Sequence, residues 1–226
     1  MSIEKALNQL LEYEKLRESF PDLVTLLNEY RVRKSDPGVK DQLFLSLIES
    51  YVEVYNEYLK KTDEVNYLSI TDPLTKTYNR VKFNELLDLE LQRARRYRRF
   101  FTLILTDIDR FKSINEKWGT ETADEVLLLV LKHVRNHSRK TDYIGRWGGE
   151  EFVILLTETD ITGGIELAGR MRYDVENGEY PVSEKVTATF GVTQNLPSDS
   201  ADTIITRVTR LHDEAKTSGG NRIIAK

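Results

Sequence analysis

The segment DYIGRWGGEEFVILL, residues 142–156, restricts the fold of this chain more than any other segment. Two runs rich in apolar and aromatic residues flank a Gly-Gly pair, which is the pattern of two antiparallel strands joined by a tight turn. Glycine adopts positive φ at little steric cost, so Gly148 and Gly149 both suit such a turn. The segment therefore predicts a β-hairpin, with Glu150 and Glu151 at its tip and at the start of its second strand.

The segments around this hairpin predict a mixed sheet covered by helices. Residues 101–109 (FTLILTDID) are an apolar run with strand composition, and residues 123–139 have the pattern of a buried helix. Further along the chain, the pattern predicts helices at 163–177 and 203–218, a strand at 184–194 and a short closing strand at 221–226. The order β-α-β-β-α-β, with additions, indicates an α+β domain with a ferredoxin-like core.

Residues 1–68 have a different pattern, with leucines and tyrosines at three- and four-residue steps. This spacing predicts an all-helical module. Such a short module hides little apolar surface alone, and dimerisation through a helix at 41–61 would bury more. We therefore expect two domains, a helical regulatory or dimerisation region at 1–68 and a second domain at 69–226.

Composition excludes several classes of function. The chain has no cysteine and only three histidines, so it carries no disulfide framework, no thiolate metal site and no histidine-rich metal centre. A net charge of −4 lacks the basic excess of a general nucleic-acid binder. No apolar run has the length of a membrane span, and the expected location is the cytoplasm.

Two acidic pairs lie where strands are predicted to end or begin. Asp107 and Asp109 close the apolar run at 101–109, and Glu150 and Glu151 follow the turn glycines. Hard oxygen ligands of this kind suit Mg²⁺, which completes its coordination shell with water and substrate phosphates. On spacing alone a metal site is no better supported than the alternative, in which Asp109 caps the next turn and Asp107 only ends a strand.

Five motifs in order resemble the GGDEF family. RWGGEEF resembles its signature hairpin in the GGEEF form, and DPLTKTYNR (72–80) resembles its domain-opening motif. DIDRFKSINEKWG (107–119), ATFGVT (188–193) and AKTSGGN (215–221) resemble three further family motifs. A single GGEEF would be weak evidence, whereas five ordered motifs over about residues 70–226 are specific.

The resemblance implies a diguanylate cyclase, a nucleotidyltransferase that condenses two GTP into cyclic di-GMP with loss of two pyrophosphates. The fold implied is similar to the palm of nucleotide cyclases and polymerases. By the resemblance, Asp107, Glu150 and the backbone carbonyl of Ile108 would bind Mg²⁺, two ions per active site. Glu150 would also be the base for the ribose 3′-hydroxyl, and Glu151 an accessory metal ligand.

The resemblance also implies roles for residues that contact the nucleotide. Lys112 would offset phosphate charge in the transition state. Asn115 and Asp124 would read the guanine edge, since a carboxylate accepts from the N–H donors of guanine. The backbone at Arg110 and Phe111 would cradle phosphates, and Lys216 would contact the terminal phosphates.

A further motif, RKTD at 139–142, resembles the family's inhibitory site for cyclic di-GMP. Arg139 would fork onto guanine or phosphate, and Asp142 would accept from guanine. An ordinary surface ion pair is the alternative. The resemblance also implies a homodimer, in which each half holds one GTP, and residues 60–75 are expected to form the joint between the two domains.

The sequence departs from the family pattern most seriously at Gly220, where the family has an arginine that contacts the triphosphate. Arg222 could substitute if residues 220–222 were a strand, since both side chains would then lie on one side. Two other functions remain open. A domain with a weakened triphosphate pocket could be a receptor for GTP or cyclic di-GMP, and a helical scaffold with a relic domain would bind no nucleotide.

Overall fold

The computed structural model describes residues 70–226, together with 56, 60, 61 and 65. Contacts divide the chain into two compact units, Met1–Val65 and Asn66–Lys226. Apart from residues 56, 60, 61 and 65, the helices predicted within 1–68, including the dimerisation helix at 41–61, lie outside the described residues, as do residues 62–64 and 66–69 of the joint at 60–75.

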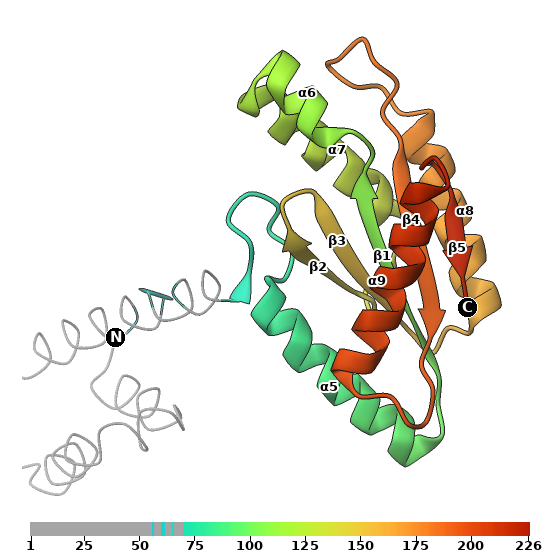
Figure 1. Ribbon diagram of the computed structural model, residues 1–226. Helices are drawn as coiled ribbons and strands as arrows, with labels where there is room; N and C mark the ends of the chain where they lie inside the picture. The colour runs from blue at the N-terminus through green and yellow to red at the C-terminus, as the bar shows by residue number, and fades with distance from the viewer. Residues whose placement is uncertain (1–55, 57–59, 62–64, 66–69) are drawn as a thin grey trace, which may run out of the picture. The chain divides into compact units, whose positions relative to one another are not determined.

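The second unit is a five-stranded sheet with helices on both faces (Figure 1). Its elements are α5 (Arg80–Tyr97), β1 (Phe101–Ile108), α6 (Phe111–Trp118), α7 (Thr120–His137), β2 (Tyr143–Gly148), β3 (Glu151–Thr157), α8 (Ile161–Glu176), β4 (Ala188–Gln194), α9 (Ala201–Thr217) and β5 (Ile223–Ala225). The strand order is β2-β3-β1-β4-β5. All neighbours are antiparallel except β4 and β5, so the predicted mixed sheet in an α+β domain is confirmed.

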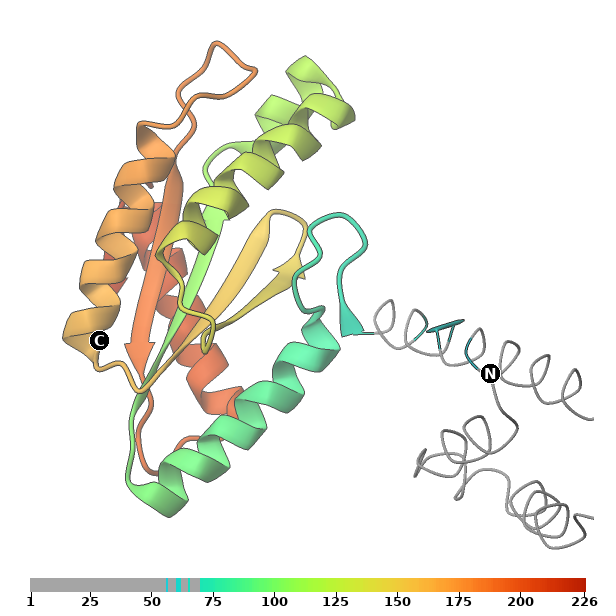
Figure 2. The same ribbon diagram turned by 180° about the vertical axis from the view of Figure 1, so that it is seen from behind.

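Alternation along the central strand β1 builds two cores. Ile104 and Ile108 face the helices α7 and α8, while Leu103 and Leu105 face α5 and α9. Figure 1 shows α5 and α9 in front of the sheet, and Figure 2 shows α7 and α8 in front of its other face. Since side chains alternate between the faces, Asp107 follows Leu105 onto the α9 side.

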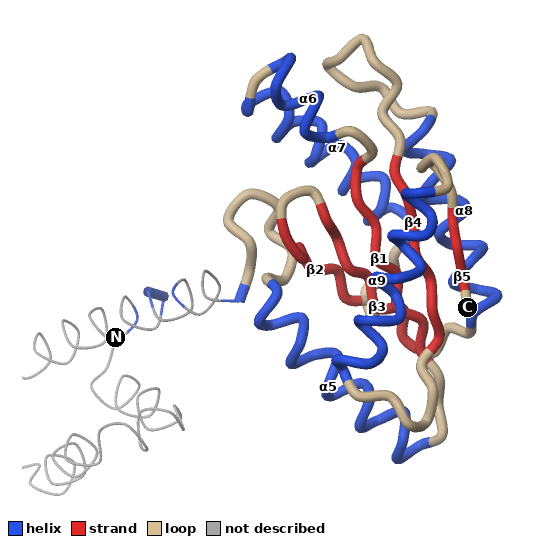
Figure 3. The backbone as a smooth tube through the Cα atoms, in the orientation of Figure 1, coloured by secondary structure: helices blue, strands red, loops and turns tan. Residues whose placement is uncertain are grey.

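The predicted hairpin joins β2 to β3 through a tight turn (Figure 3). Only Gly149 has positive φ, at +39°, whereas Gly148 still belongs to β2 and pairs with Glu151. The prediction that both glycines occupy the turn is therefore wrong for Gly148. The register of the β2–β3 pairing shifts between Arg146 and Gly148, and this irregularity allows Gly148 to pair with Glu151.

Helix α9 lies unusually close to β4 because Gly191 has no side chain. A Cβ at this position would come within 2.6 Å of both the backbone nitrogen of His212 and the carbonyl oxygen of Val208. The helix begins at a capping box formed by Ser200 and Thr203. These two constraints fix where the last turns of α9 meet the end of β1.

None of the helices in the described part of the chain is both long and apolar enough to cross a membrane.

Candidate functional site

Two carboxylates meet where β1 ends and β3 begins. Asp107 and Glu151 are directly opposite each other in the antiparallel ladder, so their side chains lie on the same face of the sheet. Burial, and then the charge of Asp107, raise the pKa of Glu151. This edge of the sheet therefore concentrates negative charge in a partly dehydrated place.

Glu150 lies one residue earlier, in the turn, and its charge also contributes to raising the pKa of Glu151. The ladder thus places Glu151, rather than Glu150, beside Asp107. The assignment of Glu150 as base and metal ligand stays a prediction, as does that of the Ile108 carbonyl at the last position of β1.

Two cation-forming side chains of α9 face this pair of carboxylates. Lys216 forms ion pairs with Asp107 and with Asp109, the latter at 2.8 Å between Nζ and Oδ1. Burial opposes the charge of Lys216, but the hydrogen bonds and charges of the two aspartates prevail and raise its pKa. One turn earlier, Nε2 of the buried His212 lies 3.2 Å from Oδ1 of Asp107.

Two of these buried atoms have no hydrogen bond of good geometry among the described residues: Oδ1 of Asp107 and Nε2 of His212. Buried polar atoms are rarely left in this state, and such atoms at a site are a reason to expect a ligand or a functional constraint. No three Asp, Glu or His side chains of the described residues form a ready-made metal cage. Mg²⁺ does not need one, because one or two carboxylates, water and substrate phosphates complete its shell.

Asp109 has a different task from Asp107. Its carboxylate accepts hydrogen bonds from the hydroxyls of Thr187 (2.7 Å) and Thr189 (2.6 Å), from Lys216, and from the backbone amide of Asn221 (2.9 Å). It does not cap α6, whose N-cap residue is Arg110 without a side-chain hydrogen bond. Asp109 therefore joins β1, β4 and the end of α9, and the alternative that it caps the next turn is wrong.

We expect Asp109→Asn to lower the free energy of unfolding by about 3 kcal/mol near neutral pH, because a buried carboxylate with four donors loses its charge. Burial opposes the charge of Asp109, but the hydrogen bonds from Lys216 and the threonines outweigh it and lower the pKa below its ordinary value of 3.8. The stabilisation is therefore present above 3.8 and lost as the pH falls through the lowered pKa, where the variant and the wild type should converge.

Urea denaturation at several pH values, followed by tryptophan fluorescence, measures this. Both tryptophans of the chain, Trp118 and Trp147, lie in the second unit, so the signal reports that unit alone. Asp88→Asn, at an exposed position of α5, is the matched control. Equal stability of Asp109→Asn and wild type at neutral pH would remove Asp109 from its structural role.

A hollow of about 690 Å³ lies beside Asp109, between the start of α6 and the end of α9. Its cationic lining residues are Arg110, Lys185 and Lys216. Arg110 has φ +58° and starts α6, so the first amides of this helix, beginning at Phe111, have no partner within it. Helix N-termini with nearby cations bind phosphate groups.

Gly220 also lines this hollow, in a backbone conformation that disfavours a side chain. It has φ +71°, and a Cβ would lie 2.9 Å from Oδ1 of Asp109. Residue 220 precedes β5, so the strand argument for Arg222 as a substitute is wrong; Nε of Arg222 donates instead to the carbonyl of Gly220 at 3.2 Å. Arg222 does not line the hollow, whereas Lys185 does, with its Nζ 2.6 Å from Glu176.

The remaining nucleotide residues predicted from the sequence lie on α6 and α7. Lys112 is exposed and 3.8 Å from Glu116, and Asn115 is exposed on the same helix. Asp124 is half-buried near the start of α7, which packs on α6. The structure brings together Asp107, Glu151 and Lys216, whereas the nucleotide roles of Lys112, Asn115 and Asp124 stay predictions.

The RKTD segment forms the turn between α7 and β2. The carboxylate of Asp142 accepts from the backbone amide of Arg139 at 2.7 Å and from that of Thr157 at 3.2 Å. The side chain of Arg139 is exposed. Asp142 thus accepts hydrogen bonds from backbone amides and not from the guanidinium of Arg139. The alternative of an ordinary surface ion pair between the two side chains is therefore wrong.

Sequence analysis missed Arg146, which holds the hairpin in place. Its Nε donates to the carbonyl of Gly149 at 2.8 Å, and its guanidinium contacts both carboxylate oxygens of Asp72 at 3.0 and 3.1 Å. Asp72 in turn accepts from the backbone and hydroxyl of Thr75. The only signal for Arg146 in the sequence was its position two residues before the Gly-Gly pair.

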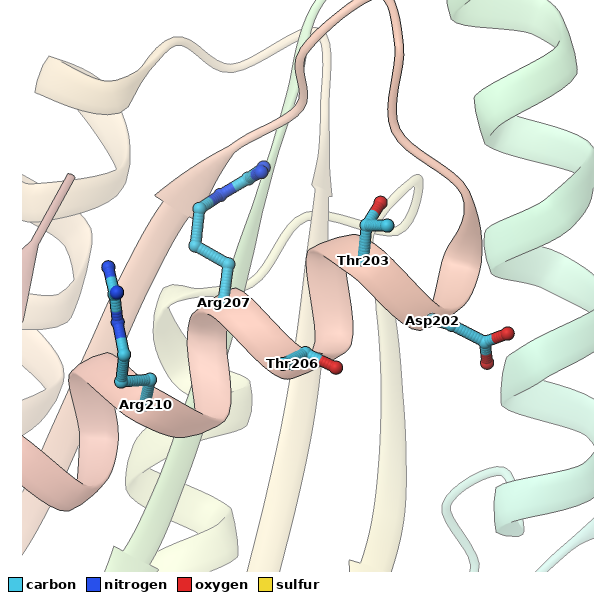
Figure 4. Close-up of a pocket in the computed structure, with 5 residues that line it drawn as sticks. All are labelled: Asp202, Thr203, Thr206, Arg207 and Arg210. Atoms are coloured by element: carbon cyan, nitrogen blue, oxygen red, sulfur yellow. The ribbon is translucent and has the colours of Figure 1, made fainter.

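A second hollow runs along the first turns of α9, far along the helix from Lys216 (Figure 4). The side chains of Arg207 and Arg210 project to one side of the helix, while Asp202 projects away from them. Arg207 is fully engaged by the Asp199 carboxylate, Thr193 and the Gln194 carbonyl. This hollow offers no group comparable with the pair at the end of β1.

Comparisons with known proteins agree with this picture. A family model described as diguanylate cyclase, GGDEF domain, matches residues 69–222. Diguanylate cyclase DgcM of Escherichia coli is 29% identical over 185 residues, which are 82% of this chain and 44% of DgcM. The chain therefore spans less than half the length of that relative.

Solved structures show the same fold. The coiled coil and GGDEF domain of DgcB from Caulobacter crescentus, solved with c-di-GMP, has a TM-score of 0.76 at 24% identity and covers 81% of this chain and 99% of that one. Diguanylate cyclase SiaD from Pseudomonas aeruginosa, solved with its activator SiaC, has a TM-score of 0.68 at 27% identity. It covers 99% of this chain and 87% of that one.

Proposed function

Because the chain belongs to the GGDEF family of diguanylate cyclases, we propose that it condenses two molecules of GTP into cyclic di-GMP with release of two pyrophosphates. The observation that carries this proposal is the meeting of Asp107 and Glu151 at the end of β1, next to the hollow with three cations. Paired carboxylates beside a hollow that offers cations for phosphate groups are what metal-assisted nucleotidyl transfer requires.

The residues at this edge fit Mg²⁺ as the cofactor. Asp107, Glu150, Glu151 and the carbonyl of Ile108 offer hard oxygen ligands. A cation there would engage Oδ1 of Asp107, which Lys216 contacts in its absence, and offset the repulsion that contributes to raising the pKa of Glu151. Bound Mg²⁺, two ions per site, would neutralise phosphate charge and favour ionisation of the attacking 3′-hydroxyl.

The chain's own residues would then divide the work. Glu150, in the turn, would take the proton of the 3′-hydroxyl. The first amides of α6 after Arg110 would hold phosphate oxygens, and Lys112 and Lys216 would add positive charge. Each 3′-hydroxyl attacks the α-phosphate of the other nucleotide, so a homodimer that brings two such sites face to face is needed.

Residues 1–68 would hold or adjust this pairing as a helical regulatory and dimerisation region, with 69–226 as the catalytic domain. The similarity to SiaD over nearly the whole chain supports this division, since SiaD was solved with an activator. Arg139 and Asp142 would bind cyclic di-GMP as an inhibitory product, as the resemblance implies. The exposed side chain of Arg139 leaves room for that role.

Turnover of GTP measured against protein concentration tests the whole proposal. With Mg²⁺ present, chromatography of the nucleotides should show cyclic di-GMP and pyrophosphate, and the rate per chain should rise with concentration as dimers form. A chain that is monomeric at working concentration yet turns over fully contradicts the dimer. Absence of cyclic di-GMP at every concentration contradicts the enzyme.

A receptor is the second candidate, favoured by the lack of a side chain at Gly220. A hollow without a guanidinium at this position offers fewer charge-assisted bonds to a triphosphate. The same incubation separates the two, because a receptor binds cyclic di-GMP by calorimetry but forms none from GTP.

We expect Asp124→Ser to relax the choice of GTP over ATP by about 10-fold, since a charged acceptor for the guanine N–H groups is replaced by a hydroxyl. Competition between the two nucleotides in binding, measured with and without the substitution, checks this. Glu125→Ser, at the exposed next position of α7, should leave the preference unchanged. Unchanged discrimination in Asp124→Ser would mean that another residue reads guanine.

A further inference from the structure

A buried histidine lies behind the carboxylate that we assign to the metal. His212 is only 3% exposed, and its Nε2 is 3.2 Å from Oδ1 of Asp107. Nε2 of His212 has no hydrogen bond of good geometry among the described residues, whereas Oδ1 of Asp107 also forms the ion pair with Lys216. A histidine that merely fills the core would leave Nε2 unpaired at a cost of about 1–3 kcal/mol relative to an apolar side chain.

The fold leaves His212 little freedom to move away. Its backbone nitrogen lies against Gly191 of β4, so closely that a Cβ there would come within 2.6 Å. On its other edge, Nδ1 is 3.9 Å from Oδ1 of the exposed Asp213. Strand β4 pairs with β1, which carries Asp107. The close contact of α9 with β4 therefore holds the imidazole of His212 beside Asp107.

Asp107 is contacted by α9 at two successive turns. Lys216 forms an ion pair with it, and His212 reaches the same oxygen from four residues earlier. Lys216 also has Asp109 as a partner, so it can leave Asp107 without losing its ion pair. His212 has no such second acceptor among the described residues, apart from the distant Asp213.

We propose that His212 is a positioning residue, which donates Nε2–H to Asp107 and fixes the orientation of this carboxylate for the cation. The inference rests on the proposed function. A small rotation of either side chain turns the 3.2 Å contact into a hydrogen bond. Partners of metal ligands that act in this way typically change metal affinity by about 10- to 100-fold when they are removed.

Three substitutions separate positioning from packing. His212→Leu and His212→Met keep an apolar side chain of similar volume but remove the donor. His212→Gln keeps an N–H donor at comparable reach. His133→Leu, at a half-buried position of α7 on the other side of the sheet, is the matched control.

The protein is mixed with a GTP analogue that has a methylene group between the α- and β-phosphorus atoms. Mn²⁺ is then titrated in, and its binding is measured by the relaxation of water protons. This analogue cannot release pyrophosphate, so the readout is independent of turnover. We expect the Mn²⁺ midpoint to rise at least 10-fold in His212→Leu and His212→Met, and to return to within about 3-fold of wild type in His212→Gln. Urea denaturation without metal should show Leu and Met variants at least as stable as wild type.

Two failures are distinguishable. If the wild type shows no relaxation enhancement, or shows one that persists in Asp107→Asn, the proposed function fails. If wild type binds Mn²⁺ through Asp107 and the Leu and Met variants bind equally well, only the positioning role is overturned. If the Leu and Met variants unfold, the Gln variant still tests the proposal. A Mn²⁺ midpoint raised 10-fold in a folded Gln variant would contradict donation of a hydrogen bond from residue 212 to Asp107.

Discussion

Replacing Asp107 with asparagine is expected to reduce formation of cyclic di-GMP by about 1000-fold or more. The substitution keeps the shape of the side chain but removes a charged oxygen ligand at the end of β1, and metal assistance supplies several kcal/mol to such transfers. Initial rates at saturating GTP, over a wide range of Mg²⁺ concentration, measure the loss. Excess Mg²⁺ should recover little, because the ligand itself is gone.

The hairpin glutamates provide the comparison for Asp107. If Glu150 is the base, Glu150→Gln should match the loss in Asp107→Asn, while Glu151→Gln should shift the Mg²⁺ requirement more than the maximal rate. Glu151 is the residue opposite Asp107 in the ladder, so the reverse pattern would exchange the two roles. Near-normal activity of Asp107→Asn would contradict the assignment of this edge as the active site.

The elements that carry the site could be predicted because their signals are local. The apolar run at 101–109 and the Gly-Gly turn can each be recognised from a few neighbouring residues. The strand β1 and the hairpin strands β2 and β3 lie where the sequence predicts them. The sequence-based expectations include only the basic end of helix α5, at residues 93–97, and miss its start, although Asn79 caps it. Its buried face is narrow and its other positions are rich in charge, which weakens the apolar pattern.

The contacts within the site could not be predicted, because they join residues far apart in the sequence. Nothing near Asp109 indicates that Thr187, Thr189 and Asn221 will saturate its carboxylate. Nothing near His212 indicates that Gly191 allows α9 close enough for its imidazole to reach Asp107. Which of two adjacent carboxylates faces a site also depends on register, and a shift of one residue exchanges Glu150 and Glu151.

Replacing Lys216 with methionine is expected to destabilise the metal-free protein by about 3–5 kcal/mol and to reduce turnover by about 100-fold. Methionine keeps the length of the side chain, but Asp107 and Asp109 lose the ammonium group that they share. Asp107 and Glu151 are then left opposite each other without a cation. Urea denaturation followed by tryptophan fluorescence measures the stability, and nucleotide chromatography measures the turnover.

The cause of the instability can be separated from lost packing by pH and by metal. The folded-state pKa of Glu151 is already raised, so its charge penalises the fold at neutral pH and the penalty falls as the pH is lowered through that raised pKa. The stability difference between Lys216→Met and wild type should therefore shrink in mild acid. Mg²⁺ should stabilise the variant more than the wild type, since in the variant the cation has no ammonium group to displace from Asp107.

Lys112→Met, at an exposed position of α6, should show neither effect. A deficit in Lys216→Met that is the same at every pH and Mg²⁺ concentration would mean that the carboxylates do not share a cation site.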